Sequence, residues 1–250
     1  MVFRMSDERI AVFIDFENLA RGAKDAKLER LDVAKILERI VEKGRIVVKR
    51  AYADWSQYQS DKRPLHEAGI ELVDIPQRKY SGKNSADIKM VVDAMDMCYS
   101  KEHLSVFVLA SGDSDFAALV AKLKENDKTV VGVGVRNSTS DLLAGNCDEF
   151  IFYDDLAKPK RRSSKKLAEV PKSKQEGFKL VLDAVAALRR EDKEVIWGSM
   201  VKQTVKRKQP SFSESSYGYQ SFSEMLEDGQ KLKLFQITKD QKSGSYILSS

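Results

Sequence analysis

Two apolar stretches of the sequence each end at an aspartate. Asp15 closes the first of them, within the segment FIDFEN at 13–18, and Asp113 follows the apolar run VLASG at 108–112. If both runs are strands of one parallel sheet, their carboxyl ends meet at the same edge, where such sheets bind ligands. Asp87 stands in the first turn of a predicted helix. Carboxylates that converge from separate elements in this way are too charged to stay unpaired unless they bind a cation.

The chemistry that suits such a group is metal-assisted hydrolysis. Oxygen ligands of this kind favour Mg²⁺ or Mn²⁺, which keep several waters and are held by a few carboxylates together with substrate phosphate oxygens. The ion polarises the phosphate and lowers the pKa of a bound water. The only histidines, His66 and His103, lie outside these segments, and no G-x-S-x-G motif occurs. The sequence therefore favours phosphodiester hydrolysis, with Asp15, Asp87 and Asp113 as metal ligands.

Three further polar residues are predicted to support this centre. Asn18 lies one helical turn after Asp15, and Ser111 lies shortly before Asp113. Both are placed to hydrogen-bond a carboxylate or a water bound to the metal. Lys83, which precedes the predicted helix, is placed to meet a phosphate oxygen.

An alternative role stays open for the acids, because an aspartate after a strand also serves as a helix N-cap or a turn former. This alternative weighs most on Asp115, which stands near the start of the next predicted helix, where backbone N–H groups favour negative charge. Asp93 follows Asp87 by six residues, about 240° round a helix, so the two do not share a face. Asp93 is therefore either a supporting residue of the site or a structural one.

The elements that must position these residues alternate between β-type and helical patterns. Predicted strands are 10–15, 46–53, 70–75, 105–110, 130–135 and 150–153. Predicted helices are 32–43, 55–68, 85–99, 114–126 and 139–144. Near-continuous Val, Ile and Phe strands separated by helices are typical of a parallel sheet buried on both faces. The fold class is therefore α/β, a doubly wound parallel sheet sandwich.

The charge of the chain divides by region. Residues 1–156 carry 23 Lys and Arg against 27 Asp and Glu, a net charge of −4, whereas residues 157–250 carry 20 against 11, a net charge of +9. Residues 157–173 are rich in basic residues and show no apolar periodicity, which indicates a flexible basic linker between a domain at 1–156 and a domain at 174–250. An acidic domain followed by a basic one predicts a cation site beside a region attracted to phosphate backbones.

The second domain shows the pattern of a small winged-helix-like module. Predicted helices at 175–189, 198–206 and 219–228 precede a predicted hairpin of 231–235 and 245–248. Basic and aromatic side chains gather on and after the second helix, and they suit phosphates and unpaired bases. The candidate RNA-binding residues are Lys202, Lys206, Arg207, Lys208 and Tyr219. The alternative is a solvated helix face beside core aromatics, and Phe222 is expected in the core.

Three strings in the first domain carry a resemblance to a known family. FIDFENL at 13–19, KNSADIKMVVDAM at 83–95 and LASGDSDF at 109–116 resemble, in this order, the NYN domain, a branch of the PIN-like nucleases. The similarity covers roughly residues 8–156. It implies a PIN-like fold and a Mg²⁺- or Mn²⁺-dependent ribonuclease. It also implies an acidic cluster and supporting motif positions, which fall here on Asp15, Asp87 and Asp113, and on Asp115, Asn18 and Asp93.

Residues 175–250 resemble, more loosely, the LOTUS or OST-HTH domain, with YGYQSFSEML at 217–226 as the most similar string. This resemblance implies a winged-helix-like domain that binds RNA. The combined prediction is a ribonuclease that cuts RNA internally and holds the strand with its second domain and linker. Two alternatives remain open: an RNA-binding adaptor without catalysis, and a nuclease for DNA or a phosphatase. No apolar run reaches the 18 residues of a membrane span, no signal peptide is recognised, and a cytoplasmic location is expected.

Overall fold

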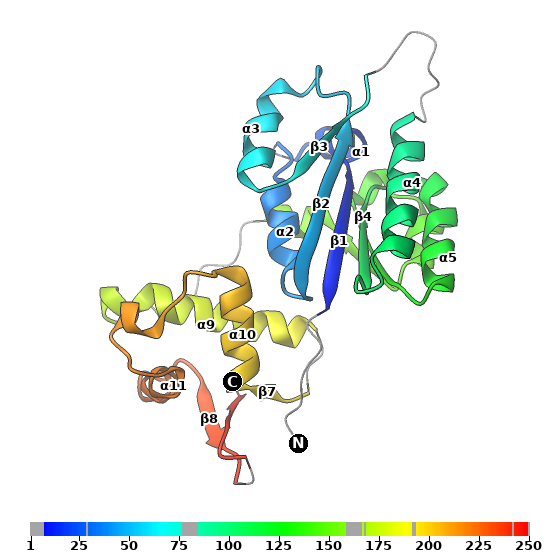
Figure 1. The fold of residues 1–250 in the computed structure, drawn as a ribbon. Helices are drawn as coiled ribbons and strands as arrows, with labels where there is room; N and C mark the ends of the chain where they lie inside the picture. Colours follow the sequence, from blue (N-terminus) through cyan, green and yellow to red (C-terminus); the bar gives the residue numbers. More distant parts are fainter. Residues whose placement is uncertain are drawn as a thin grey trace. The chain divides into compact units, whose positions relative to one another are not determined.

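A computed structural model describes residues 8–28, 30–76, 85–158, 167, 169–191, 194–241 and 243–249. The chain folds into two compact units, one of Met1–Ile40 and Gly44–Pro159 and the other of Val41–Lys43 and Lys160–Ser250 (Figure 1). Among the helices of the described residues, none has the length and apolar character needed to cross a membrane.

A parallel sheet forms the centre of the first unit. Its strands are β1 (Arg9–Asp15), β2 (Arg45–Ala53), β3 (Glu71–Asp74), β4 (Val106–Ala110), β5 (Thr129–Gly134) and β6 (Glu149–Phe152). They lie in the order β3-β2-β1-β4-β5-β6, and each neighbouring pair is parallel. Ile14 near the end of β1 pairs with Ala51 of β2 on one side and with Ala110 of β4 on the other. The doubly wound parallel sheet predicted from the sequence is confirmed.

Helices cover both faces of this sheet (Figure 1). One face packs against α1 (Phe16–Asp25), α2 (Val33–Ile40), α3 (Gln59–Glu67) and α7 (Tyr153–Ala157). The other face packs against α4 (Ser85–Ser100), η1 (Ser114–Phe116), α5 (Ala117–Glu125) and α6 (Asp141–Asn146), and η2 (Arg136–Ser138) follows β5. Side chains of β1 alternate between the two cores: Val12 and Ile14 enter the first, Ala11 and Phe13 the second. This double burial explains why the central strands β1, β4 and β5 are apolar at nearly every position.

Helix α1 is absent from the predicted elements. Its buried positions Phe16, Leu19 and Ala23 have helical spacing, but polar residues and Gly22 surround them, so the apolar pattern is short. Gly22 is required by packing, because a Cβ at this position would lie 2.3 Å from the Ser138 hydroxyl oxygen. The predicted helices at 32–43 and 55–68 are also shorter in the structure, where they become α2 and α3.

The second unit contains three main helices and a small antiparallel sheet. Its helices are α9 (Lys172–Arg190), α10 (Gly198–Lys208), η3 (Glu214–Tyr217) and α11 (Phe222–Lys231). Its strands are β7 (Ile196–Trp197), β8 (Gln236–Lys239) and β9 (Tyr246–Ser249), in the order β7-β9-β8. The helices enclose a core around Phe178, Val181, Met225 and Leu226. The winged-helix-like arrangement predicted from the sequence is confirmed.

Two predicted elements of this unit were misplaced. The helix predicted from Tyr219 begins at Phe222, because the Ser221 hydroxyl caps it by accepting a hydrogen bond from the Glu224 backbone N–H at 3.1 Å. The first strand of the hairpin is Gln236–Lys239 and not 231–235, since α11 continues to Lys231 before the chain turns.

The predicted linker at 157–173 is too long at both ends. Ala157 belongs to α7, and α9 begins at Lys172. Leu167 and Val170 are 7% and 3% exposed and pack in the core of the second unit. Their apolar side chains explain why this end of the segment is structured. The second unit therefore begins before residue 174.

Candidate active site

The candidate site lies where the strand order of the sheet reverses. β1 and β4 are central neighbours, and the helices that follow them, α1 and α5, pack on opposite faces. The loops after two such strands diverge and leave a crevice at the carboxyl edge, which is where open α/β sheets bind ligands. Asp15 is the last residue of β1, and Asp113 follows β4 by three residues. The topology thus brings two of the predicted acids to the same crevice.

Asp15 is a buried carboxylate, 7% exposed. One carboxylate oxygen accepts a hydrogen bond from the Asn18 backbone N–H at 3.1 Å, which makes Asp15 the N-cap of α1. The other accepts a hydrogen bond from the Ser111 hydroxyl at 2.9 Å. The pKa of Asp15 is nevertheless raised to about 6, mainly by burial and also by the negative charges of Asp87 and Glu17, which together outweigh these two bonds.

Asp113 lies in the segment that connects β4 to α5. Its carboxylate accepts a hydrogen bond from the Asp115 backbone N–H at 3.0 Å and so caps η1. Its own backbone N–H donates to the Ser111 hydroxyl oxygen at 3.2 Å. Ser111 therefore joins Asp15 to Asp113, and the predicted contact between Ser111 and a carboxylate is confirmed. Both acids therefore cap a helix and also lie at the candidate site.

Asp87 lies in the first turn of α4, and α4 begins at the carboxyl end of the sheet (Figure 1). Burial raises its pKa, and the negative charges of Asp113, Asp115 and Glu17 raise it further. Asp87 also acts on Asp15. Electrostatic interactions therefore link Asp87 to Asp15 and to Asp113.

Glu17 is a member of this group that the sequence interpretation missed. It raises the pKa of both Asp15 and Asp87, and its carboxylate accepts a hydrogen bond from the Asp54 backbone N–H at 2.7 Å. Asp54 follows β2 and is itself buried. The signal that identifies Glu17 is helix α1: a residue in the first turn of a helix that follows a central strand stays at the carboxyl edge.

A divalent cation fits this donor set. Within the described residues, the neighbours whose charges shift the pKa of Asp15 or Asp87 are acids, and no lysine or arginine is among them. The same part of the chain holds no ready-made group of three side chains positioned to coordinate a metal. Mg²⁺ does not require one, since it is held by one or two carboxylates, waters and substrate phosphates.

Asn18 bonds the Asp15 carboxylate through its backbone N–H, whereas its side chain has a different partner. Its side-chain oxygen accepts a hydrogen bond from the Gly112 backbone N–H at 2.9 Å, so it ties the start of α1 to the loop after β4. Gly112 has no room for a side chain, because a Cβ there would lie 2.2 Å from the Ser138 carbonyl oxygen. Asn18 thus positions the two strand ends against each other. Asp115 is exposed beside them, and Lys83 lies outside the described residues.

Asp93 belongs to a separate cluster. It is 8% exposed and accepts hydrogen bonds from the Tyr52 hydroxyl at 2.9 Å and from Lys89 at 2.7 Å. A guanidinium nitrogen of Arg50 lies 3.5 Å from the same carboxylate. Asp93 is therefore paired with cations in a structural network, which decides between the two roles that the sequence left open.

Some candidate RNA-binding residues of the second unit also have partners within their own domain, whereas others are exposed. Tyr219 is only 4% exposed, its ring packs against Phe178, and its hydroxyl donates to Asp228 at 2.6 Å. Its prediction as a base-stacking residue was wrong, because the core takes up the ring. Lys202 forms an ion pair with Glu214 at 2.7 Å.

The last turn of α10 carries the remaining basic candidates. Arg207 donates to the Thr204 hydroxyl at 3.1 Å, Lys206 is exposed, and Lys208 is the final residue of the helix. Phe222 is 7% exposed and lies in the core, as predicted. Of these three basic residues, Lys206 is exposed, whereas Arg207 and Lys208 are half-buried.

This protein has a doubly wound parallel α/β domain with acids at its central carboxyl edge. A winged-helix-like unit follows this domain. The NYN domain model matches residues 9–154, and the OST-HTH/LOTUS domain model matches residues 179–247. The chain belongs to the NYN domain family, a branch of the PIN-like nuclease superfamily, and carries a C-terminal OST-HTH/LOTUS domain.

Two similar proteins carry no functional description of their own. An uncharacterized protein of Methanocaldococcus jannaschii is 30% identical over 181 residues, which cover 69% of this chain and 70% of the relative. A crystal structure of a protein of unknown function from Vibrio parahaemolyticus has a TM-score of 0.54 and 24% identity, and the match covers 61% of this chain and 96% of that one. The second likeness concerns the fold alone.

Proposed function

We propose that this protein is a metal-dependent ribonuclease that hydrolyses phosphodiester bonds within an RNA strand. The observation that carries the proposal is the buried carboxylate of Asp15 at the switch point of the sheet, facing the charges of Asp87 and Glu17 without a basic partner among the groups that shift its pKa in the described residues. The membership of the chain in a nuclease superfamily supports hydrolysis, and the LOTUS domain of the chain supports RNA as the substrate.

In this proposal Asp15, Asp87 and Asp113 hold Mg²⁺ or Mn²⁺. When bound, the ion supplies Lewis acidity to the phosphate and lowers the pKa of a bound water. The side chains around the acids hold them in position. Ser111 fixes one oxygen of Asp15 and the backbone before Asp113, and Asn18 holds the loop after β4 against α1. These bonds hold the acids in place before a substrate arrives, so that little reorganisation is needed during the reaction.

RNA is retained, in this proposal, by the basic segment between the domains and by the carboxyl end of α10. Lys206 is the exposed candidate there. Contacts of this kind neutralise phosphates without reading sequence, so binding is expected to weaken steeply as salt concentration rises. Lys202 and Tyr219 are withdrawn from the candidate surface because their side chains have partners within the domain.

The test is cleavage by the full chain of a circular single-stranded RNA, which has no ends for an exonuclease. We expect linear products with Mg²⁺ or Mn²⁺, none with EDTA, and none from Asp87→Asn. Asp96→Asn is the matched control, since Asp96 is an exposed aspartate of the same helix. Cleavage that persists in EDTA, or that survives Asp87→Asn, contradicts the proposal.

The same assay separates the alternatives. Tight RNA binding with no cleavage under any metal favours the adaptor without catalysis. Equal cleavage of a matched DNA circle favours a nuclease that does not select RNA, and the 2′-hydroxyl is then not read.

A further inference from the structure

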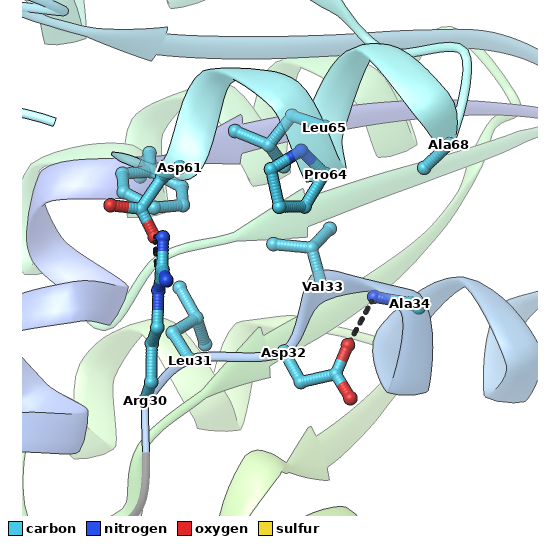
Figure 2. A pocket seen from close by; sticks show the side chains of 10 residues that line it. Arg30, Leu31, Asp32, Val33, Ala34, Asp61, Pro64, Leu65 and Ala68 are labelled. Atoms are coloured by element: carbon cyan, nitrogen blue, oxygen red, sulfur yellow. Dashed lines mark hydrogen bonds and ion pairs between the residues drawn. The ribbon is translucent and has the colours of Figure 1, made fainter. Parts of the chain in front are cut away.

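Two pockets adjoin each other beside helix α3, apart from the acidic crevice. Their volumes are about 310 and 300 Å³, and they share the lining residues Phe16, Arg30, Leu31 and Asp61. Figure 2 shows the first of them, which lies between α3 and the start of α2. We call the two pockets together the Arg30 groove, because Arg30 lies at their junction. Volumes of this size suit a small organic ligand or a nucleotide.

Arg30 is held in the groove by two neighbours on α3. Its Nε donates to the Asp61 carboxylate at 2.8 Å, and its Nη2 donates to the Ser60 hydroxyl at 3.1 Å. The Arg30 side chain is 57% exposed, while that of Asp61 is 16% exposed (Figure 2). The bonds fix the plane of the guanidinium and leave the group accessible. A fixed, accessible guanidinium plane is a surface on which nucleic-acid bases stack.

The groove also has an aromatic wall and an apolar floor. Tyr58 lines the second pocket, with its ring centre 5.1 Å from that of Phe16 in an edge-on contact. Leu31 and Leu65 lie in the floor of the first pocket, and Lys24 lines the second. A flat, apolar ligand that carries negative charge nearby matches this combination of surfaces.

Two residues of the groove are related to the acidic crevice. Phe16, which lines both pockets, directly follows Asp15. Tyr58 lies within electrostatic reach of the crevice: burial raises its pKa, and the charge of Glu17 is the next largest contribution, with Asp15 also contributing. Phe16 and Tyr58 therefore relate the lining of the groove to the acidic residues.

We propose that the Arg30 groove is a nucleobase subsite, which takes up the base of one RNA nucleotide next to the phosphodiester bound at the acidic crevice. The inference rests on the proposed function, since it assumes that the crevice binds RNA. Arg30 and Tyr58 bind the base by stacking, and Lys24 attracts its phosphate. The subsite gives the nuclease a preference for the base at one position beside the cut.

The experiment measures nucleotide binding without cleavage. Trp55 is buried 5.2 Å from Phe16 and 6.5 Å from Tyr58 by ring centres, so its fluorescence reports on the groove. Trp197→Phe removes the signal of the second domain. The full chain with this change is titrated in EDTA with each of the four nucleoside 5′-monophosphates and with ribose 5-phosphate.

We expect a saturable change for at least one nucleotide, no change with ribose 5-phosphate, and an affinity about tenfold lower in Arg30→Ala. Arg63→Ala is the matched control, because Arg63 forms an exposed ion pair with Glu67 on the same helix, at 2.8 Å. An equal response to ribose 5-phosphate, no response to any nucleotide, or unchanged affinity in Arg30→Ala overturns the subsite. Metal-dependent cleavage of the circular RNA is scored separately, so the subsite and the ribonuclease proposal fail independently.

Discussion

Two buried aspartates of the first domain have opposite surroundings. Asp15 at the end of β1 is bonded to neutral groups only among the bonds described, and other acids raise its pKa. Asp93 on α4 is equally buried, but Lys89, Arg50 and the Tyr52 hydroxyl surround it. A buried charge that has cationic partners maintains the fold, whereas a buried charge among other acids costs stability unless a ligand supplies the missing cation. The contrast separates a structural carboxylate from a candidate catalytic one.

The largest expected effect is on cleavage and comes from two aspartates of one helix. Asp87→Asn is expected to lower metal-dependent cleavage at least about 100-fold, because an amide is a poor ligand for a hard cation. Asp93→Asn is expected to change the cleavage rate less than about threefold when assayed well below its unfolding temperature. Initial rates on the same RNA at saturating Mn²⁺ measure both. Similar losses in the two variants erase the distinction.

The next effect is on stability and has the opposite ranking. Asp93→Ala removes the carboxylate that pairs with Lys89 and accepts from the Tyr52 hydroxyl, while Arg50 keeps its ion pair with Glu71 at 2.8 Å. The change is expected to lower the free energy of unfolding by about 2 kcal/mol, a value reduced for the exposure of Lys89. Asp87→Ala is expected to lower it by much less, since it removes a repelled charge. Urea unfolding in EDTA compares the two. A smaller loss for Asp93→Ala than for Asp87→Ala contradicts the structural role.

A pH effect follows from Asp15. Burial raises its pKa from 3.8 to about 6, so between these values the folded protein binds the proton that the unfolded chain releases. In metal-free protein the free energy of unfolding is expected to fall by about 1–2 kcal/mol as pH rises from 4 to 7. Asp15→Asn is expected to remove this decline, and Asp96→Asn to keep it. An identical pH dependence of the free energy of unfolding in wild type and Asp15→Asn would show that Asp15 does not cause the decline.

The smallest effect comes from Tyr52. Tyr52→Phe removes one hydrogen bond to Asp93 but keeps the ring in the core, and is expected to cost about 1 kcal/mol or less because the two cations remain. The shift in unfolding temperature in EDTA measures it. A loss as large as that of Asp93→Ala shows that the hydroxyl, and not the cations, carries the network.

The sheet was predictable from the sequence because burial on both faces forces apolar residues into every strand. The six predicted strands overlap β1 to β6, and the order of the strands brings Asp15 and Asp113 to one edge. Helix α1 was not predictable by the same reasoning, since few of its residues are apolar. Missing this helix also hid Glu17, whose place in the site depends on it.

The surroundings of single side chains were beyond the sequence pattern. Asp87 and Asp93 lie on one helix and look alike in sequence, and only the packing of Tyr52 and Arg50 from β2 shows which one is neutralised. Tyr219 stands in a polar segment, yet its ring enters the core, where Phe178 receives it. Contacts between distant elements decide these cases, and no local spacing encodes them.

The most direct test of the central claim is Mn²⁺ binding by the full chain at pH 7.5 without RNA, measured by isothermal titration calorimetry. The account predicts saturable binding that Asp15→Asn, Asp87→Asn or Asp113→Asn each weakens at least about tenfold, while Asp96→Asn leaves it unchanged. Binding that none of the three substitutions weakens would contradict the claim that these carboxylates share a cation.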